Sequence, residues 1–493
     1  MKRRSDKYRK QEITKKKKKS FRRKIFGTLV IILILVSIAC MGLLYYTNLL
    51  PLKHFLMISG GFAFLDLISI ILIYAKGWKK RMFGTILSIL MIIVSIVGIV
   101  YEANILGIFS GAKAPGYKIQ NYKVIVLSSS KFKEVSDIEN EYVGILNPEE
   151  IEGLPEAVAK LNKKVDVYYS EIDDLKILED NLLSGDLGVI MLEDSYYEIA
   201  KEENADFEKS TKVIDKFEVK VPIGGLAKEV DVTKEPFTIF ISGIDTYGEI
   251  SSVSRSDVNM LVTVNPNTHK ILMTSIPRDY YVHLHGITSY KDKITHAGIH
   301  GIDMSVKTAE DLLDCDINYY VKVNFTSVVD IVDALGGIEV ESPYTFTTYD
   351  DKYTFNKGYN KLDGEKALYF VRERKAFDGG DRTRNQNQQL VLTAIINKML
   401  TKSMITKYDK ILDAVDGSFV TNMGSKNYTN LIKKQIKNNY KWKIESYYLE
   451  GTDSMDYTYS YKSAMSYVME PDEDSVNEAI AKIKKVINEG KKK

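Results

Sequence analysis

The chain has few residues of the kinds that build cross-links and nucleophilic sites. Only two cysteines occur among its 493 residues. Cys40 lies inside a long apolar run and Cys315 lies far beyond it, so we do not expect them to form a disulfide. No Gly-x-Ser-x-Gly motif and no glycine-rich phosphate-binding loop occurs. These absences exclude a disulfide scaffold and give no sign of a serine hydrolase or a P-loop nucleotide site.

Long uncharged apolar runs, by contrast, are frequent near the N-terminus. They cover residues 25–46, 54–75 and 82–101, and only the second contains a charge, Asp66. Each is about 20 residues long, enough to cross a hydrocarbon core of roughly 30 Å. A cleaved signal peptide explains the first run less well, because two more runs follow it. We predict a membrane anchor of three helices over residues 25–101.

The distribution of lysine and arginine predicts the orientation of this anchor. Residues 1–24 hold fourteen basic residues, the 76–81 loop holds four, and the 47–53 loop holds only Lys53. Basic loops stay in the cytoplasm, so we expect a basic cytoplasmic tail and an extracellular part after about residue 102. A polybasic run beside a membrane span mainly fixes topology and contacts anionic membrane lipids, so direct DNA binding is disfavoured. An external part without disulfides suits a Gram-positive cell surface.

The extracellular part has the pattern of two α/β domains. Short β-branched runs alternate with segments of helical spacing over residues 118–222, which predicts a small accessory α/β domain. A polar stretch at 224–236 separates it from a larger α/β domain at 236–485. Only the lysine-rich ends of the chain look unstructured. The expected fold class is therefore α/β behind a three-helix anchor.

A predicted hairpin in the larger domain brings charged residues together. Its strands are residues 258–264 and 271–277, and a turn centred on 266–268 pairs residues whose numbers sum to about 535. Asp257 then lies opposite Arg278. If the preceding strand, which ends at Asp245, is a neighbour, one edge of the sheet gathers Asp245, Arg255, Asp257, Arg278 and Asp279. Sites are usually built in loops at such strand ends.

These residue types suit a diphosphate bound with a divalent cation. The carboxylates of Asp245 and Asp257 suit Mg²⁺ or Mn²⁺, and guanidinium groups grip phosphate oxygens in pairs. Four arginines lie in FVRERKAFDGGDRTRNQNQQ, residues 370–389, where Arg384 and Gln388 share a helix face.

Two plainer interpretations compete with this one. Surface ion pairing explains the aspartates equally well. The arginine run could be a solvated face with Glu373, Asp378 and Asp381 as its partners, but it adjoins a Gly-Gly turn that opens a helix, a usual place for anion contact.

Four of the six histidines cluster at His283, His285, His296 and His300. The spacing in HAGIH raises the alternative of zinc. The glutamate of a zincin helix is missing and Gly298 weakens a helix there, so ordinary packing or hydrogen-bonding histidines are favoured.

Several long motifs, in order, resemble the LytR-CpsA-Psr family. They are ISGIDTYGEISSVSRSDVNMLVTVNPNTHKILMTSIPRD, DKITHAG, INYYVKVNF, LGGIEV and FVRERKAFDGGDRTRNQNQQ. The resemblance is close over residues 237–400. Three spans followed by an extra domain resemble the capsule-linked streptococcal type of this family, CpsA or Wzg. The resemblance implies a catalytic domain at 236–485 with a central mixed sheet flanked by helices.

The family resemblance also implies an activity. Such proteins transfer a glycopolymer, capsular or teichoic, from an undecaprenyl-pyrophosphate carrier to peptidoglycan outside the membrane. They need Mg²⁺ and have polyprenyl pyrophosphatase activity. Their lipid tail lies in an apolar pocket between sheet and helices, expected here beside residues 326–335 and 390–400.

The family's site residues carry over onto matching positions. Asp245 and Asp257 match metal-side aspartates, and with Arg278 they are the expected catalytic set; either aspartate could be the base. The phosphate-clamping positions are Arg255, Arg278, Arg372, Arg374, Arg384 and Gln388. Asp381 matches a supporting acidic position. Thr383 and Gln386 depart from the family pattern and Arg382 is added, which predicts a rearranged clamp.

A non-catalytic role is the alternative. The chain would then be a membrane regulator of capsule or envelope assembly that binds the lipid-linked intermediate or capsule assembly proteins. Transcriptional attenuation is a weaker version of this alternative, because the folded mass is expected outside the cell. The arginines and aspartates gathered at one sheet edge favour chemistry.

Overall fold

The computed structural model describes residues 2–490 except 48–49, 51, 112–115, 148–150, 245–251, 378–379 and 402–418. Its contacts divide the chain into two compact units. The helices of residues 1–110 form the first unit, and nearly all of residues 111–493 belong to the second.

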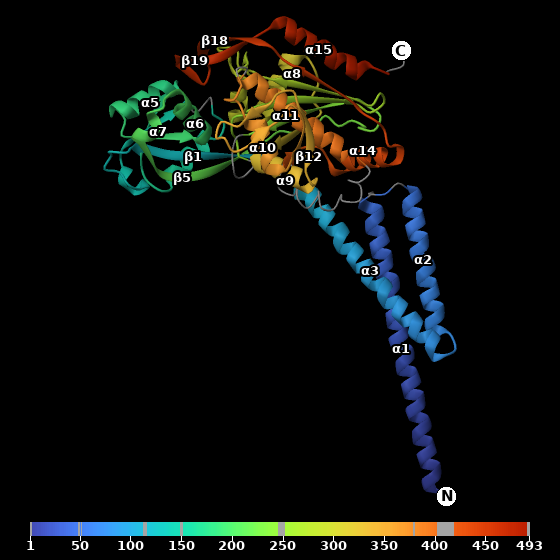
Figure 1. Ribbon diagram of the computed structural model, residues 1–493. Helices are drawn as coiled ribbons and strands as arrows, with labels where there is room; N and C mark the ends of the chain where they lie inside the picture. The colour runs from blue at the N-terminus through green and yellow to red at the C-terminus, as the bar shows by residue number, and fades with distance from the viewer. Residues whose placement is uncertain are drawn as a thin grey trace. The chain divides into compact units, whose positions relative to one another are not determined.

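Three long helices make up the first unit (Figure 1). They are α1 (Lys2–Thr47), α2 (Leu52–Tyr74) and α3 (Trp78–Gly111). The segments Arg23–Thr47, Leu52–Tyr74 and Trp78–Ala103 are long and apolar enough to cross a membrane, which confirms the three predicted spans. The prediction of an unstructured N-terminal tail was wrong, because α1 begins at Lys2. Lysine, arginine and glutamine favour helices, and neither glycine nor proline precedes Gly27.

The second unit contains two sheets, and the N-terminal lobe, residues 117–222, is built on the smaller one. Its strands lie in the order β3-β2-β4-β1-β5. They are β1 (Tyr117–Leu127), β2 (Tyr142–Leu146), β3 (Tyr168–Ile172), β4 (Val189–Glu193) and β5 (Thr211–Pro222). The helices are η1 (Val135–Ile138), α4 (Leu154–Asn162), α5 (Leu175–Ser184), α6 (Asp194–Glu203) and α7 (Phe207–Ser210). Apolar β-branched runs at 123–127, 142–146, 165–169 and 187–192 predict β1 to β4, and helical spacing at 154–164 and 172–183 predicts α4 and α5. The pattern did not predict α6, α7 or β5.

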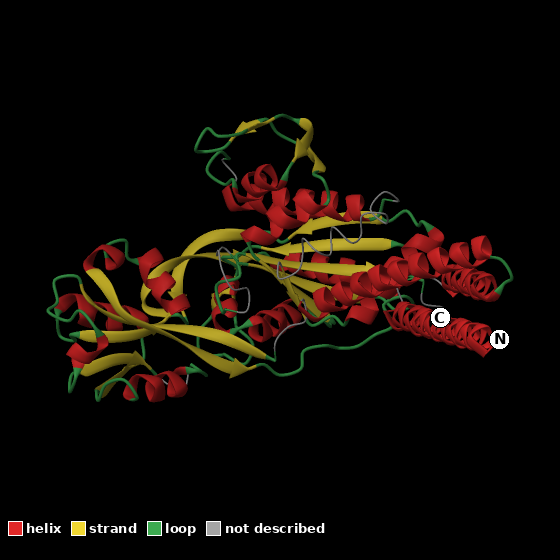
Figure 2. Ribbon diagram, turned by 90° about the horizontal axis from the view of Figure 1, so that it is seen from below, coloured by secondary structure: helices red, strands yellow, loops and turns green. Residues whose placement is uncertain are grey.

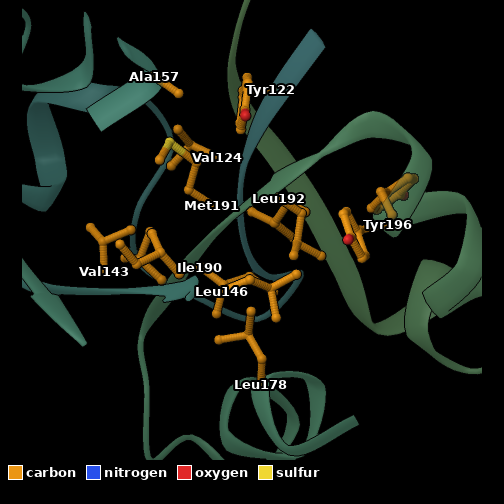
Figure 3. Packing of buried hydrophobic residues seen from close by; sticks show 14 of the residues in the cluster. Tyr122, Val124, Val143, Leu146, Ala157, Leu178, Ile190, Met191, Leu192 and Tyr196 are labelled. Carbon is orange, nitrogen blue, oxygen red and sulfur yellow. The ribbon is translucent and has the colours of Figure 1, made fainter. Parts of the chain in front are cut away.

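The central strands of this lobe form its hydrophobic core (Figure 3). Val124 of β1 and Ile190 of β4 are fully buried, as is Leu178 of α5. Residues 124–127 of β1 and 189–192 of β4 are covered on both faces, which explains why these parts are continuous apolar runs rather than alternating patterns.

The C-terminal lobe, residues 237–488, surrounds a mixed sheet of order β16-β11-β6-β7-β8-β17. Its strands are β6 (Phe237–Gly243), β7 (Val258–Asn265), β8 (Lys270–Ile276), β11 (Tyr319–Val323), β16 (Phe419–Thr421) and β17 (Lys443–Tyr448). The β7–β8 hairpin pairs Asn259 with Ile276, so paired numbers sum to 535 as predicted. The side chain of Asn265 accepts from the amides of Asn267 and Thr268 (3.0 and 3.2 Å) and closes the turn.

Helices cover both faces of this sheet, as predicted (Figure 2). On one face, α8 (Ile302–Leu313) and α15 (Glu473–Asn488) pack on a core that includes Phe240 and Leu261. On the other face lie α9 (Phe325–Ala334), α10 (Gly364–Arg372) and α11 (Gly380–Met399), and α14 (Ser425–Asn438) follows later in the chain. Asp363 is the N-cap of α10 and accepts from the amide of Lys366 (2.8 Å).

Small elements complete the lobe and join it to its neighbour. They are β9 (Tyr281–Val282), β10 (Asp292–Lys293), η2 (Ile294–His300), β12 (Ile338–Ser342), β13 (Phe346–Thr347), β14 (Thr354–Phe355), β15 (Gly358–Leu362), β18 (Gly451–Thr458) and β19 (Tyr461–Pro471). The amide of Val253 donates to Ile119 O (2.8 Å), and that of Lys462 donates to Asp174 Oδ2 (2.7 Å). The two lobes therefore meet at several points within one compact unit.

Candidate functional site

A cavity of about 630 Å³ lies between the larger sheet and helices α9, α10 and α11. Its apolar walls come from alternate residues of three strands and from the facing sides of α9 and α11. They are Ile241, Val258, Met260, Val321, Val323, Val328, Ile331, Val391, Leu392 and Ile395. The cavity thus lies between the sheet and the two helical segments where the family resemblance places a lipid pocket.

Charged residues line one end of the cavity, where strands of the larger sheet begin or end. Gly243 and Val323, the last residues of the parallel strands β6 and β11, are register partners there. Asp257 precedes β7 and Arg278 follows β8, and both line the cavity. Arg278 Nη1 donates to Asp257 Oδ1 (2.8 Å), the contact predicted from the hairpin register. Ligands commonly bind at such an edge, outside the carboxyl ends of parallel strands.

The arginine-rich stretch contributes a second wall. Arg372 ends α10, and Arg374 follows it after one residue; both are exposed and line the cavity. Arg384 and Gln388 lie one turn apart on α11 and line the same cavity, as their spacing predicts. Segments distant in sequence therefore bring guanidinium groups to one place.

Glu373 was expected as an ion-pair partner of these arginines under the plainer interpretation. Instead its Oε1 accepts from the backbone amides of Arg374 and Ala376 (3.0 and 2.9 Å), and its Oε2 accepts from that of Tyr349 (2.8 Å). This buried carboxylate fixes the turn that carries Arg374.

The arginine added at residue 382 lies away from the cavity, and a rearranged clamp stays a prediction. Arg382 is largely exposed and forms an ion pair with Glu450 at 2.5 Å. It is not among the residues that line the cavity, whereas Arg384 is. The added arginine thus forms a surface ion pair, and the arginine at the family position faces the cavity.

Backbone contacts of the DKITHAG motif, residues 292–298, hold the segments that carry the charged residues of the cavity. Thr295 accepts from the amide of Ser256 and donates its own amide to Arg278 O, both at 3.0 Å. A side chain on Gly298 would collide with the backbone of residues 254–256, so the glycine lets η2 lie against the Arg255 segment. The motif therefore positions the backbones of two candidate site arginines.

The histidines of this region have structural contacts. His296 Nδ1 lies 2.6 Å from Asp292 Oδ1, and Ser460 donates to Asp292 Oδ2 (2.6 Å). Burial acts to raise the pKa of Asp292, but contact with His296 and these hydrogen bonds hold it below its ordinary value. Burial lowers the pKa of His300 to about 4, so its ring is neutral at pH 7.

One residue of the charged end was missed by sequence reasoning. Glu202, near the end of α6 in the N-terminal lobe, lines the cavity and forms ion pairs with Arg255 and Arg278. Arg255 itself is mostly buried, which lowers the pKa of its guanidinium from the ordinary value, and nearby Asp257 opposes that effect. No local motif surrounds Glu202, so only the docked lobe reveals it.

Three residues named from the sequence have no described side chain. Asp245 and Asp378 lie outside the described residues, and of Asp381 only its place in α11 is described. Within the part of the chain that the structure describes, no group of three or more histidine, cysteine, aspartate or glutamate side chains is placed to hold a metal ion.

Comparison with protein families decides the classification. Residues 191–484 match the profile of the LytR_cpsA_psr family, which covers more than half of the chain. The chain belongs to the LytR-CpsA-Psr family. The LytR-CpsA-Psr region includes α6 and the whole sheet and helix framework around the cavity.

Curated relatives within the LytR-CpsA-Psr family carry transferase names. Polyisoprenyl-teichoic acid–peptidoglycan teichoic acid transferase TagU of Bacillus cereus is 39% identical over 215 residues, which are 42% of this chain and 69% of the relative. TagU of Bacillus subtilis is 38% identical over 230 residues, 46% of this chain and 72% of the relative. The prediction of an enzyme of this family agrees with these names.

Solved structures of family members are also similar. The crystal structure of B. subtilis TagV has 33% identity and a TM-score of 0.45, and the match covers 52% of this chain and 98% of TagV. TagT bound to LIIa-WTA has 32% identity and a TM-score of 0.43, with 53% of this chain and 94% of TagT covered.

Proposed function

We propose that this enzyme transfers an undecaprenyl-pyrophosphate-linked glycopolymer to peptidoglycan at the outer face of the membrane. One observation carries the proposal: a single cavity joins apolar walls to an end lined by arginines. A lipid pyrophosphate has the same two parts, an apolar tail and a dianionic or more highly charged head. The match of tail and head to the two parts of the cavity supports a ligand of this class.

The cavity residues suggest a division of roles. Arg278, Arg372, Arg374 and Arg384 would neutralise the pyrophosphate and the charge that develops on the leaving lipid phosphate, and Gln388 would donate a further hydrogen bond. The apolar side chains of α9 and α11 would hold the polyprenyl chain away from water. Positive groups fixed in advance around the phosphates lower the barrier, because they need not reorganise during the reaction.

A magnesium ion is part of the proposal. Carboxylate oxygens are its preferred protein ligands, and Asp257, which lines the charged end, would supply them together with Asp245, which lies outside the described residues. The bound ion would add positive charge at the phosphate oxygens.

The transferred polymer is proposed to be a wall teichoic acid. The teichoic acid transferase names of the TagU relatives support this choice. A capsular polysaccharide, expected from the three spans and the extra lobe, is the second polymer to test.

The activity can be tested with the purified full-length protein in detergent. With undecaprenyl pyrophosphate and Mg²⁺ we expect phosphate release, and with a lipid-linked teichoic acid and peptidoglycan we expect polymer attached to the wall. Chelation of Mg²⁺ should stop both reactions. Binding of the lipid without turnover in either assay would contradict the proposed enzyme and favour a regulator.

The proposed location requires the second unit to face outward. Fourteen basic residues before the first span and four in the 76–81 loop support a cytoplasmic N-terminus. We expect protease added to intact, wall-stripped cells to digest the part beyond residue 102 and to spare the basic tail. Protection of that part, with digestion of the tail, would reverse the topology.

A further inference from the structure

The N-terminal lobe contributes a carboxylate to the charged end of the cavity. Glu202 Oε1 accepts from Arg278 Nη2 (3.2 Å), and its Oε2 contacts Arg255 Nη1. Its side chain is 38% exposed, so it lies at the mouth rather than in the depth of the site. A carboxylate there occupies guanidinium donors that match phosphate oxygens equally well.

Contacts around Glu202 hold it in place. The neighbouring Glu203 pairs with Lys293 at 3.1 Å, and both side chains are largely buried. The Ile119–Val253 backbone hydrogen bond lies in the segment that leads to Arg255. The position of Glu202 therefore depends on how the N-terminal lobe docks on the C-terminal lobe.

The charges immediately around Arg255 and Arg278 are unfavourable for an incoming anion. Two guanidinium groups, Arg255 and Arg278, face three carboxylates, Asp257, Asp279 and Glu202. The arginine pair is thus already neutralised before any phosphate arrives. A pyrophosphate that entered beside all three carboxylates would meet like charges at close range, which costs binding energy.

We infer that Glu202 is a built-in competitor for the pyrophosphate, which must displace it from Arg278, the arginine of this pair that lines the cavity. The inference rests on the proposed function, because it assumes that Arg278 binds phosphate. Both oxygens of Glu202 face guanidinium groups, so this side chain is poorly placed to take a proton from an acceptor. Docking of the N-terminal lobe then tunes substrate affinity at a site that belongs to the other lobe.

Titration with inorganic pyrophosphate and Mg²⁺ tests this inference on the full-length protein in detergent. We expect Glu202→Gln to bind pyrophosphate about tenfold more tightly than wild type, because the competing charge is gone. The KM for polyprenyl pyrophosphate should fall in parallel, without loss of turnover. Glu202→Ala should shift affinity in the same direction, and melting curves check that both variants fold.

Glu208→Gln is the matched control, because it removes an exposed carboxylate of the same lobe, paired with Lys201 at 2.9 Å, without touching a site arginine or the interface between the lobes. Its affinity should stay within about threefold of wild type. Equal tightening in both variants would overturn direct competition by Glu202. Unchanged or weaker binding by Glu202→Gln, or a loss of turnover, would also overturn it, since a positioning role predicts that loss.

The measurements distinguish failure of the competitor role from failure of the proposed function. If wild type binds pyrophosphate and cleaves the lipid but Glu202→Gln behaves identically, only the competitor role is lost. If neither protein binds pyrophosphate nor turns over lipid, both proposals fail together.

Discussion

Replacement of Arg374 by lysine is expected to lower turnover of the lipid pyrophosphate by two to three orders of magnitude. Lysine keeps the positive charge but loses the planar fork that binds two phosphate oxygens at once. Arg374 lines the cavity, and Glu373 holds its turn through the hydrogen bond from the Arg374 amide (3.0 Å). The backbone that carries Arg374 is thus fixed before substrate binds. Arg372→Ala should have an effect of similar size.

The expected loss of turnover in Arg374→Lys follows from the surroundings of Arg374 in the complex with substrate. Arg374 is exposed in the free protein, so its surroundings become dry only when the lipid substrate covers it. A donor aimed at developing charge in such a covered site contributes roughly 3 kcal/mol, or about 10²–10³-fold in rate. A solvated surface arginine contributes at most about 1 kcal/mol.

Arg382→Lys is the matched control, because it makes the same change in the same stretch. Arg382 pairs with the exposed Glu450 and does not line the cavity, so turnover should change by no more than about twofold. Steady-state kinetics with melting curves measure both variants. If Arg374→Lys and Arg372→Ala both stay within about fivefold of wild type, the phosphate clamp does not exist.

Part of the charged end of the site could be predicted from the sequence, because strand alternation and helical spacing fix which side chains lie close together. Strand alternation and the polar turn set the β7–β8 register, and that register alone places Asp257 against Arg278. Helical spacing places Arg384 and Gln388 on one face of α11. Such predictions succeed because short-range geometry leaves little freedom.

Contacts between distant segments were beyond this kind of reasoning. Glu202 reaches Arg278 only because two lobes dock, and nothing in the sequence around it marks a site. The bonds from Glu373 to backbone amides also depend on how the loop at Tyr349 approaches α10. A charge near other charges in sequence predicts an ion pair, but tertiary packing decides its partner.

The missed strand β5 has a similar explanation. It lies at the edge of its sheet, and its charged residues alternate with apolar ones along much of its length. Charged side chains are common on edge strands, where they discourage pairing with another chain. The central strand β4 and residues 124–127 of β1 were easier to predict, because burial on both faces favours a continuous apolar run.

Asp257→Ala is expected to abolish magnesium-dependent turnover while the fold remains intact. Asp257 lines the cavity beside Arg278, and its side chain is only 12% exposed. Loss of its carboxylate removes a proposed ligand of Mg²⁺ and leaves Arg278 with two other acidic partners, Asp279 and Glu202. The ion pairs that hold Arg278 are therefore not all lost, and the melting temperature should change little.

The dependence of rate on Mg²⁺ concentration separates metal binding from support of Arg278. Asp279→Asn is the control, because Asp279 also faces Arg278, at 3.3 Å from Nε, but does not line the cavity. We expect it to keep the wild-type magnesium requirement and a rate within about tenfold of wild type. Asp257→Ala should leave only a trace of activity that needs far more Mg²⁺. An equal loss in both variants, with unchanged magnesium dependence, would mean that Asp257 orients Arg278 and holds no metal.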